Sequence, residues 1–257
     1  MKRFSLFFVA ALTLQTINST GVAQSMSDLP QSLPTEKTDE QKFNDRVSES
    51  RTRNRPTSPK ILTKGSFAPT PADHDLWKTI LSNSDTGLIR LMPRESYDWA
   101  VYSVPKTIDI RGGGAFYSFF YRAHEYGQGS DISLERDKLM SGFGGADIGI
   151  LTNLGEIPLS DITINNPEVA FLANYNPPGN EPGARVEQRS VSSGFSLSGQ
   201  DYNRRLPLKT GSTYLVRSIV YGRYDTLTAF TVTRKDEDGS VIIAWKLLKN
   251  FKTPSLN

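Results

Sequence analysis

The chain contains only two histidines, His74 and His124, and no cysteine, which limits the chemistry open to its side chains. Protein zinc sites are built from several His and Cys ligands, so we expect no zinc site within one chain. The absence of cysteine also excludes a thiol nucleophile. His124 is the stronger candidate for a general base, because Ser118 and Asp131 lie close to it in the sequence.

One hypothesis is therefore a secreted hydrolase in which His124 is the general base and Asp131 orients it. If residues 115–126 form one strand, Ser118 and His124 lie about 20 Å apart, too far for a nucleophile and its base. A hairpin at residues 127–129 would place Asp131 opposite His124 in only one of two registers. Neither a Gly-x-Ser-x-Gly nor a Ser-x-x-Lys motif is present to supply the nucleophile. A structural role for His124 is the preferred interpretation.

Two glycine clusters, at residues 112–114 and 142–145, invite comparison with nucleotide-binding loops. The first cluster is not a phosphate-binding loop, because neither Gly-Lys-Ser/Thr nor a helix start follows it. The second does not match the dinucleotide-binding motif Gly-x-Gly-x-x-Gly, because Asp147 occupies the position of the third glycine. Both are better explained as bulges or sharp bends between strands. We therefore expect no nucleotide cofactor, and no other cofactor is indicated.

The acidic segment 236–239 lies between two β-rich runs. An EF-hand is excluded because Trp245 stands where that loop requires a bidentate Glu. A loose surface calcium site on Asp236 and Asp238 is a weak alternative. A hairpin turn explains the same residues and is preferred, so no metal is expected.

The segment 115–126 is dense in aromatic residues. As a binding surface it would offer Tyr117 and Tyr121 as flat rings with polar tips, beside Arg122 and His124. As a central strand it would bury both rows in the core, which is the preferred interpretation for most of it. Because Arg122 and His124 interrupt the apolar row, the strand is expected to emerge at the edge there. These four residues are the predicted ligand-binding site.

The hydrophobic pattern predicts a capped helix at residues 70–81, with Leu76, Trp77, Ile80 and Leu81 on one apolar face. Strand-like patterns follow at 88–92, 107–110, 115–126, 131–140, 146–152 and 169–173, then at 213–221, 226–235 and 241–248. The last run is apolar on both faces, so it should lie between two layers. The predicted fold is mainly β, an antiparallel β-sandwich or barrel-like domain with one N-terminal helix.

The N-terminus has the charge, apolar run and small residues of a secretory signal peptide at 1–23, with cleavage expected after Ala23. A linker rich in polar and charged residues is predicted at 24–66, one β-rich domain at 67–252 and a short tail at 253–257. Removing Lys2 and Arg3 with the signal reduces 30 basic residues to 28 against 27 acidic ones, a net charge of +1. This balance gives little support for a nucleic-acid partner.

These features predict a protein that is secreted or periplasmic and has no membrane span after signal removal. Without a recognisable catalytic motif, the first hypothesis is a non-catalytic binding or envelope-associated protein. The expected partner is a glycan or a protein surface, contacted through Tyr117, Tyr121, Arg122 and His124.

Overall fold

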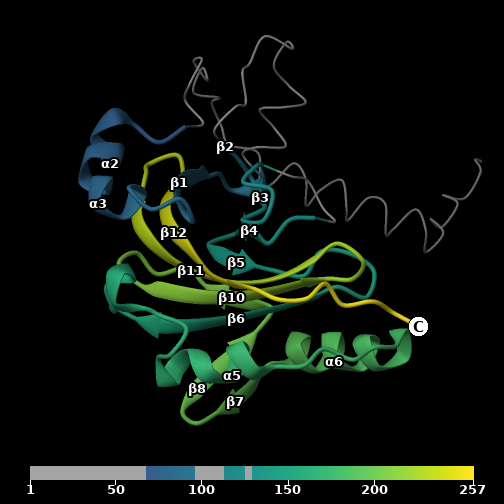
Figure 1. The fold of residues 1–257 in the computed structure, drawn as a ribbon. Coiled ribbons are helices and arrows are strands. Elements are labelled where there is room, and N and C mark those ends of the chain that lie inside the picture. The colour runs from purple at the N-terminus through teal and green to yellow at the C-terminus, as the bar shows by residue number, and fades with distance from the viewer. Residues whose placement is uncertain (1–67, 96–112, 125–128) are drawn as a thin grey trace, which may run out of the picture. The chain divides into compact units, whose positions relative to one another are not determined.

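The computed structural model describes residues 68–95, 113–124 and 129–257 (Figure 1). The predicted signal peptide, linker and strand at 107–110 lie outside these residues and stay predictions. Strands account for 40% of the structure and helices for 21%, which confirms the mainly β class. Within the described segments, no helix has the length and apolar character needed to cross a membrane.

The larger sheet has eight strands in the order β2-β1-β12-β11-β10-β6-β8-β7. Adjacent strands of this sheet are antiparallel, except β1 and β2, which are parallel. The strands are β1 (Thr86–Leu91), β2 (Gly113–Gly114), β6 (Ile148–Gly155), β7 (Phe195–Leu197), β8 (Gln200–Asn203), β10 (Thr213–Val220), β11 (Tyr224–Lys235) and β12 (Val241–Asn250).

A smaller antiparallel sheet has the order β3 (Phe116–Tyr117), β4 (Ile132–Glu135), β5 (Lys138–Met140) and β9 (Arg205–Pro207). The prediction of a single strand over 131–140 is wrong, because β4 and β5 form a hairpin. Its two turn residues, Arg136 and Asp137, both have positive φ, 47° and 60°. Positive φ at both central residues is what a type I′ turn requires, although glycine and asparagine usually supply it.

Residues 241–245 of β12 are buried on both faces, as the apolar pattern predicts, and burial decreases toward the C-terminal end of the strand. On one face, Val241, Ile243 and Trp245 pack in a core cluster shared with the smaller sheet. On the other face, Ala244 belongs to a second cluster that the helices cover, with Leu248 packed against it. The sheets do not close, so the arrangement is a layered sandwich, with helices as the third layer (Figure 1).

The predicted N-terminal helix begins as expected but is broken. Thr70 and Asp73 form a capping box at the start of α2 (Pro71–Leu76). The chain leaves helical geometry at Trp77, and α3 (Lys78–Leu81) follows. Because of this break, Leu76 points away from the core and is 77% exposed, so its assignment to the apolar face is wrong. Trp77 and Ile80 do pack against the helix-covered cluster.

Four further helical segments cover the larger sheet: η1 (Leu159–Asp161), η2 (Pro167–Val169), α5 (Ala170–Asn174) and α6 (Glu181–Ser193). The strand predicted at 169–173 is therefore wrong, since Val169 and Leu172 bury one helical face three residues apart. Helix α6 was not predicted. Its boundary signals are an Asn180 cap, whose side chain accepts a bond from Gly183, and Gly194 at its end.

A buried ion pair ties α5 to the larger sheet. Arg217 on β10 donates from Nε and Nη2 to the two carboxylate oxygens of Asp225 on β11. Its Nη1 donates to the backbone carbonyl of Leu172 in α5. The guanidinium also stacks on the Phe251 ring, with its carbon 3.1 Å from the ring centroid. The three donor contacts satisfy a charge that would otherwise be costly to bury.

Gly149 on β6 lies where the chain passes itself too closely for a side chain. A Cβ atom there would lie 2.3 Å from the Gly142 nitrogen and 2.6 Å from the Ser141 carbonyl carbon. We expect Gly149→Ala to lower the free energy of unfolding by about 1–3 kcal/mol, the usual cost of overpacking, measured by urea denaturation. Gly179→Ala is the control, because its Cβ meets no atom within 4 Å. Equal stability of the two variants would contradict this close packing.

Candidate functional site

The segment 115–126 is not one strand, which corrects the expectation for the aromatic run. Strand β3 ends at Tyr117, and the chain turns back so that Ser118 and Ala123 exchange backbone hydrogen bonds of 2.8 and 3.2 Å. Arg122, within the turn, has a positive φ of 54°. Glu125 and Tyr126 lie outside the described residues. The 20 Å separation of Ser118 and His124 assumed an extended strand and does not hold.

The buried carboxylate of Asp131 holds this turn. One oxygen accepts hydrogen bonds from the backbone amides of Phe119 (2.6 Å) and Phe120 (3.3 Å) and from the Ser118 hydroxyl (3.3 Å). The other oxygen accepts a bond of 2.9 Å from the Tyr224 hydroxyl. Complete burial raises the pKa of Asp131 to about 6, against the opposing effect of the hydrogen bonds from Tyr224 and from the amides of Phe119 and Phe120.

The turn divides the four predicted ligand-binding residues between core and surface. Tyr117 is only 5% exposed, and its ring contacts Phe119, His124 and Trp245 in the core. Tyr121 is 46% exposed, beside Phe120 at 41%. The surface portion of the predicted site therefore consists of the turn residues, while Tyr117 contributes packing.

Arg122 extends from this turn toward the loop before β1. Its guanidinium donates to the Ser84 carbonyl (2.6 Å) and to an Asp85 carboxylate oxygen (3.0 Å). Both partners are exposed, so the pair is weak in water and could exchange with a ligand. We define residues Phe120, Tyr121 and Arg122 as the turn surface.

The hydrolase hypothesis requires Asp131 to orient His124. Both Asp131 oxygens are instead engaged by the turn and by Tyr224. The Nδ1 atom of His124 lies 2.8 Å from the Phe116 carbonyl oxygen, which can only accept, so that nitrogen carries the proton. Gly114 leaves room for this ring, because a Cβ there would lie 2.9 Å from Nδ1. These contacts favour a structural role for His124 and Asp131.

The alternative calcium residues lie in the β11–β12 hairpin loop. Arg90 on β1 forms ion pairs of 3.1 Å with both Asp236 and Asp238. Arg234 pairs with Asp236 and with Asp73 of α2. A guanidinium therefore already lies where a calcium ion would have to bind. In the described part of the chain, no three His, Cys, Asp or Glu residues are grouped as metal ligands.

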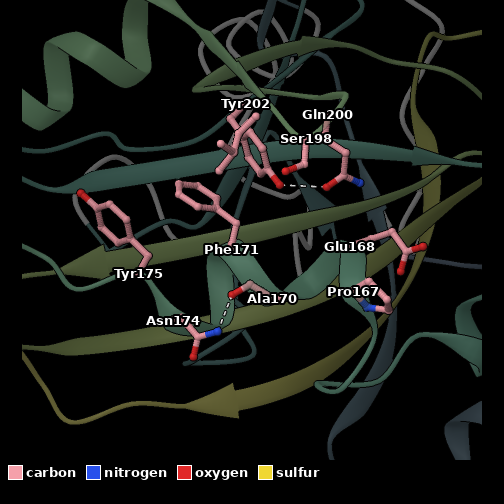
Figure 2. Close-up of a pocket in the computed structure, with 10 residues that line it drawn as sticks. Pro167, Glu168, Ala170, Phe171, Asn174, Tyr175, Ser198, Gln200 and Tyr202 are labelled. Atoms are coloured by element: carbon pink, nitrogen blue, oxygen red, sulfur yellow. Dashed lines mark hydrogen bonds between the residues drawn. The ribbon is translucent and has the colours of Figure 1, made fainter.

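A separate cavity of about 590 Å³ lies where η2 and α5 face the β7–β8 hairpin (Figure 2). We call it the α5 pocket. Its helical wall is formed by Pro167, Glu168, Ala170, Phe171, Asn174 and Tyr175. Its hairpin wall is formed by Leu197, Ser198, Gln200 and Tyr202. The volume falls within the range of pockets that bind small molecules.

A tight turn fixes the hairpin wall of the pocket, and a contact with a distant strand fixes the helical wall. The hairpin turns through Ser198 and Gly199, whose φ values of 51° and 80° fit the two-residue turn between Leu197 and Gln200. The helical wall is anchored from below by Leu172, which is fully buried and bonded to Arg217. The pocket is thus preformed by the backbone of both walls.

Aromatic rings form a continuous surface inside the pocket. The Phe171 ring lies 4.7 Å from that of Tyr202 and 6.0 Å from that of Tyr175, centroid to centroid. Phe195 stacks on Tyr202 at 5.3 Å and supports it from the adjacent strand. The Tyr175 hydroxyl donates to Glu187 on α6, and burial raises the pKa of Tyr175, so this phenol stays neutral.

Few polar groups surround these rings. The Gln200 side-chain oxygen accepts a bond from the Tyr202 hydroxyl (2.8 Å), which leaves its two amide hydrogens for other acceptors. Asn174 donates one amide hydrogen to the Ala170 carbonyl (2.9 Å), and its side-chain oxygen remains available to accept a hydrogen bond from a ligand (Figure 2). Glu168 is the only Asp, Glu, Lys or Arg in the lining, and within the described residues it forms no ion pair.

The α5 pocket is not evident from the sequence, because the short apolar run 169–173 predicts a strand. Two signals were available: Pro167, which suits the first turn of a helix, and the Ser198–Gly199 pair between two short β runs. Comparisons of the chain with models of protein families, with curated proteins and with solved structures found no match.

Proposed function

We propose that this is an exported, non-catalytic binding protein whose ligand occupies the α5 pocket. The observation that supports this most is the preformed cavity of about 590 Å³ with a continuous aromatic wall and a few polar groups at its rim. Pockets of this size and composition are the usual sites of small-ligand binding.

The chemistry of the lining favours binding over catalysis. A hydrolase needs a nucleophile with a base in reach, and a glycosidase normally needs two carboxyl groups. Among the described lining residues there is one carboxylate, Glu168, and neither His nor Lys. Ser198 supplies the only hydroxyl other than the two phenols among the lining residues that the structure describes, and it lies on an exposed turn.

Export is proposed from the first 23 residues, which have the charge, apolar run and small residues of a secretory signal peptide. We expect the secreted or periplasmic protein to begin at Gln24 when it is sequenced from its N-terminus. A protein recovered from the cytosol with Met1 or Lys2 at its N-terminus would contradict export. Because this test does not involve the pocket, its outcome is independent of the binding proposal.

The turn surface is a second candidate contact region, supported by the exposure of Phe120 and Tyr121 side by side. Tyr224 lies beneath them, with its ring stacked on Phe120 at 4.5 Å. In this form of the proposal, the turn contacts a glycan or protein of the cell envelope. Tyr121→Ala distinguishes binding at the turn surface from binding in the α5 pocket, because it removes an exposed ring of the turn surface and leaves the pocket intact.

The binding test blocks the pocket without removing a core ring. Ala170 is exposed on α5 and lines the cavity, so Ala170→Trp should fill part of it. Val186→Trp on α6 is the matched control, because it adds the same side chain at an exposed helical position outside the pocket. Ligand-observed NMR would use four probes: maltose, indole, a neutral dipeptide and butylamine.

We expect at least one probe to bind the unmodified protein and the Val186→Trp variant, with at least a tenfold loss of affinity in Ala170→Trp. No probe should be chemically altered during the measurement. Equal binding by both tryptophan variants, or binding lost only in Tyr121→Ala, would reject the α5 pocket as the site.

A further inference from the structure

The aromatic wall of the α5 pocket suits a ligand that has a flat, weakly polar face. Phe171 and Tyr175 are only partly buried, whereas Tyr202 is buried behind them. Because the Phe171 ring contacts both the Tyr175 ring and the Tyr202 ring, the three lie along one wall of the pocket and are not spread around a central cation (Figure 2). A cation held by aromatic rings would need their faces directed toward it.

The polar groups suit partners that both donate and accept. Gln200 offers two amide hydrogens, and Asn174 offers its carbonyl oxygen and one hydrogen. The Ser198 hydroxyl can do either. Ligand hydroxyl groups match such a mixed set, because each can serve as donor or acceptor. A purely apolar ligand would leave these groups without the bonds that they form with water.

The charge of the lining argues against an anionic ligand. Glu168 contributes one negative charge, and no Lys or Arg lines the pocket among the described residues. A carboxylate or phosphate bound there would meet a like charge with no nearby cation to compensate. A neutral ligand avoids this cost.

The aromatic wall, the mixed polar groups and the single negative charge all fit the same class of ligand. We infer that the α5 pocket binds a neutral oligosaccharide, with the C–H face of a pyranose ring against Phe171 and its hydroxyls bonded to Gln200, Asn174 and Ser198. This inference rests on the proposed function, because it names the ligand of the same site. Glu168 accepts hydrogen bonds from sugar hydroxyls, and its negative charge repels acidic sugars.

The test is calorimetric titration with four oligosaccharides: maltotetraose, cellotetraose, N-acetylchitotetraose and tetragalacturonate. We expect at least one neutral oligosaccharide to bind and the anionic one to bind at least tenfold more weakly. Phe171→Leu keeps an apolar side chain but removes the flat ring, and should weaken neutral binding about twofold to tenfold. Glu168→Gln should raise the relative affinity for tetragalacturonate about fivefold.

Val186→Trp should bind like the unmodified protein, and thermal unfolding of each variant confirms that it is folded. If tetragalacturonate binds best, or if Phe171→Leu leaves neutral binding unchanged, the saccharide inference is wrong. If only indole, butylamine or the dipeptide enters the pocket, the saccharide inference fails while the proposed function stands. If no probe of any class binds there, both fail.

Discussion

Asp225→Ala should lower the free energy of unfolding by about 3–5 kcal/mol, the typical cost of removing one partner of a buried ion pair. Arg217 and Asp225 are 1% and 2% exposed, so the remaining guanidinium would be left buried without its counter-charge. The loss should be large because the Arg217 side chain cannot move to water without also breaking its bond to the Leu172 carbonyl and its stacking on Phe251. Urea denaturation measures the loss directly.

The matched control removes both charges. Because a buried pair can often be replaced by apolar residues without loss, we expect Arg217→Met with Asp225→Leu to recover most of the stability. The double variant still lacks the donor to Leu172, so α5 should be held less firmly and probe binding in the α5 pocket should weaken. If Asp225→Ala were as stable as the unmodified protein, the described pairing would be wrong.

Asp131 should make the protein less stable as the pH rises from about 4 to about 6. Its pKa is raised from 3.8 to about 6 by burial, so in this interval the folded state holds a proton that the unfolded state has lost. Stability therefore falls with increasing pH, by roughly 3 kcal/mol in total for this group. Unfolding free energies measured at a series of pH values check the slope.

The Tyr224 hydroxyl has two acceptors within hydrogen-bond distance. It lies 2.8 Å from the Gly129 carbonyl oxygen and 2.9 Å from an Asp131 oxygen, yet it carries one proton. A protonated Asp131 can donate to Tyr224, which then donates to Gly129, so that both acceptors are satisfied. The ionised carboxylate leaves Tyr224 to donate to only one of them.

Asp131→Asn keeps an oxygen for the amides of the turn and adds a donor for Tyr224. We therefore expect this variant to lack the fall between pH 4 and 6 and to be at least as stable as the unmodified protein at pH 7. Asp131→Ala should be less stable at every pH, because the amides of Phe119 and Phe120 lose their acceptor. Asp147 and Asp225 also titrate with raised pKa values, so the comparison between variants isolates Asp131. Parallel curves for the unmodified protein and Asp131→Asn would contradict the assignment.

The sequence predicted the C-terminal half of the larger sheet well, because its signals are local. The acidic loop at 236–239 does join β11 and β12, with Lys235 paired to Val241. The two apolar rows of β12 do face two layers. Likewise Thr70 caps α2 as its type and position suggest. In each case, residues within a few positions of one another determine the structure.

The aromatic run and the α5 pocket depend on contacts between distant residues, so the same reasoning failed there. Nothing within 115–126 shows that Asp131 will bind the amides of Phe119 and Phe120 and turn the chain back. Tyr117 and Tyr121 therefore separate into core and surface. The pocket joins α5 to a hairpin almost 30 positions later, and the periodicity of its short apolar run does not distinguish a helix from a buried strand.

We expect ligand to bind between α5 and the β7–β8 hairpin, and amide chemical-shift mapping tests this expectation most directly. On addition of the oligosaccharide with the highest affinity, we predict that the largest shifts fall at residues 167–175 and 197–202, with none at 118–124. Shifts confined to 118–124 would assign binding to the turn surface, and the absence of site-specific shifts would contradict a binding role for the pocket.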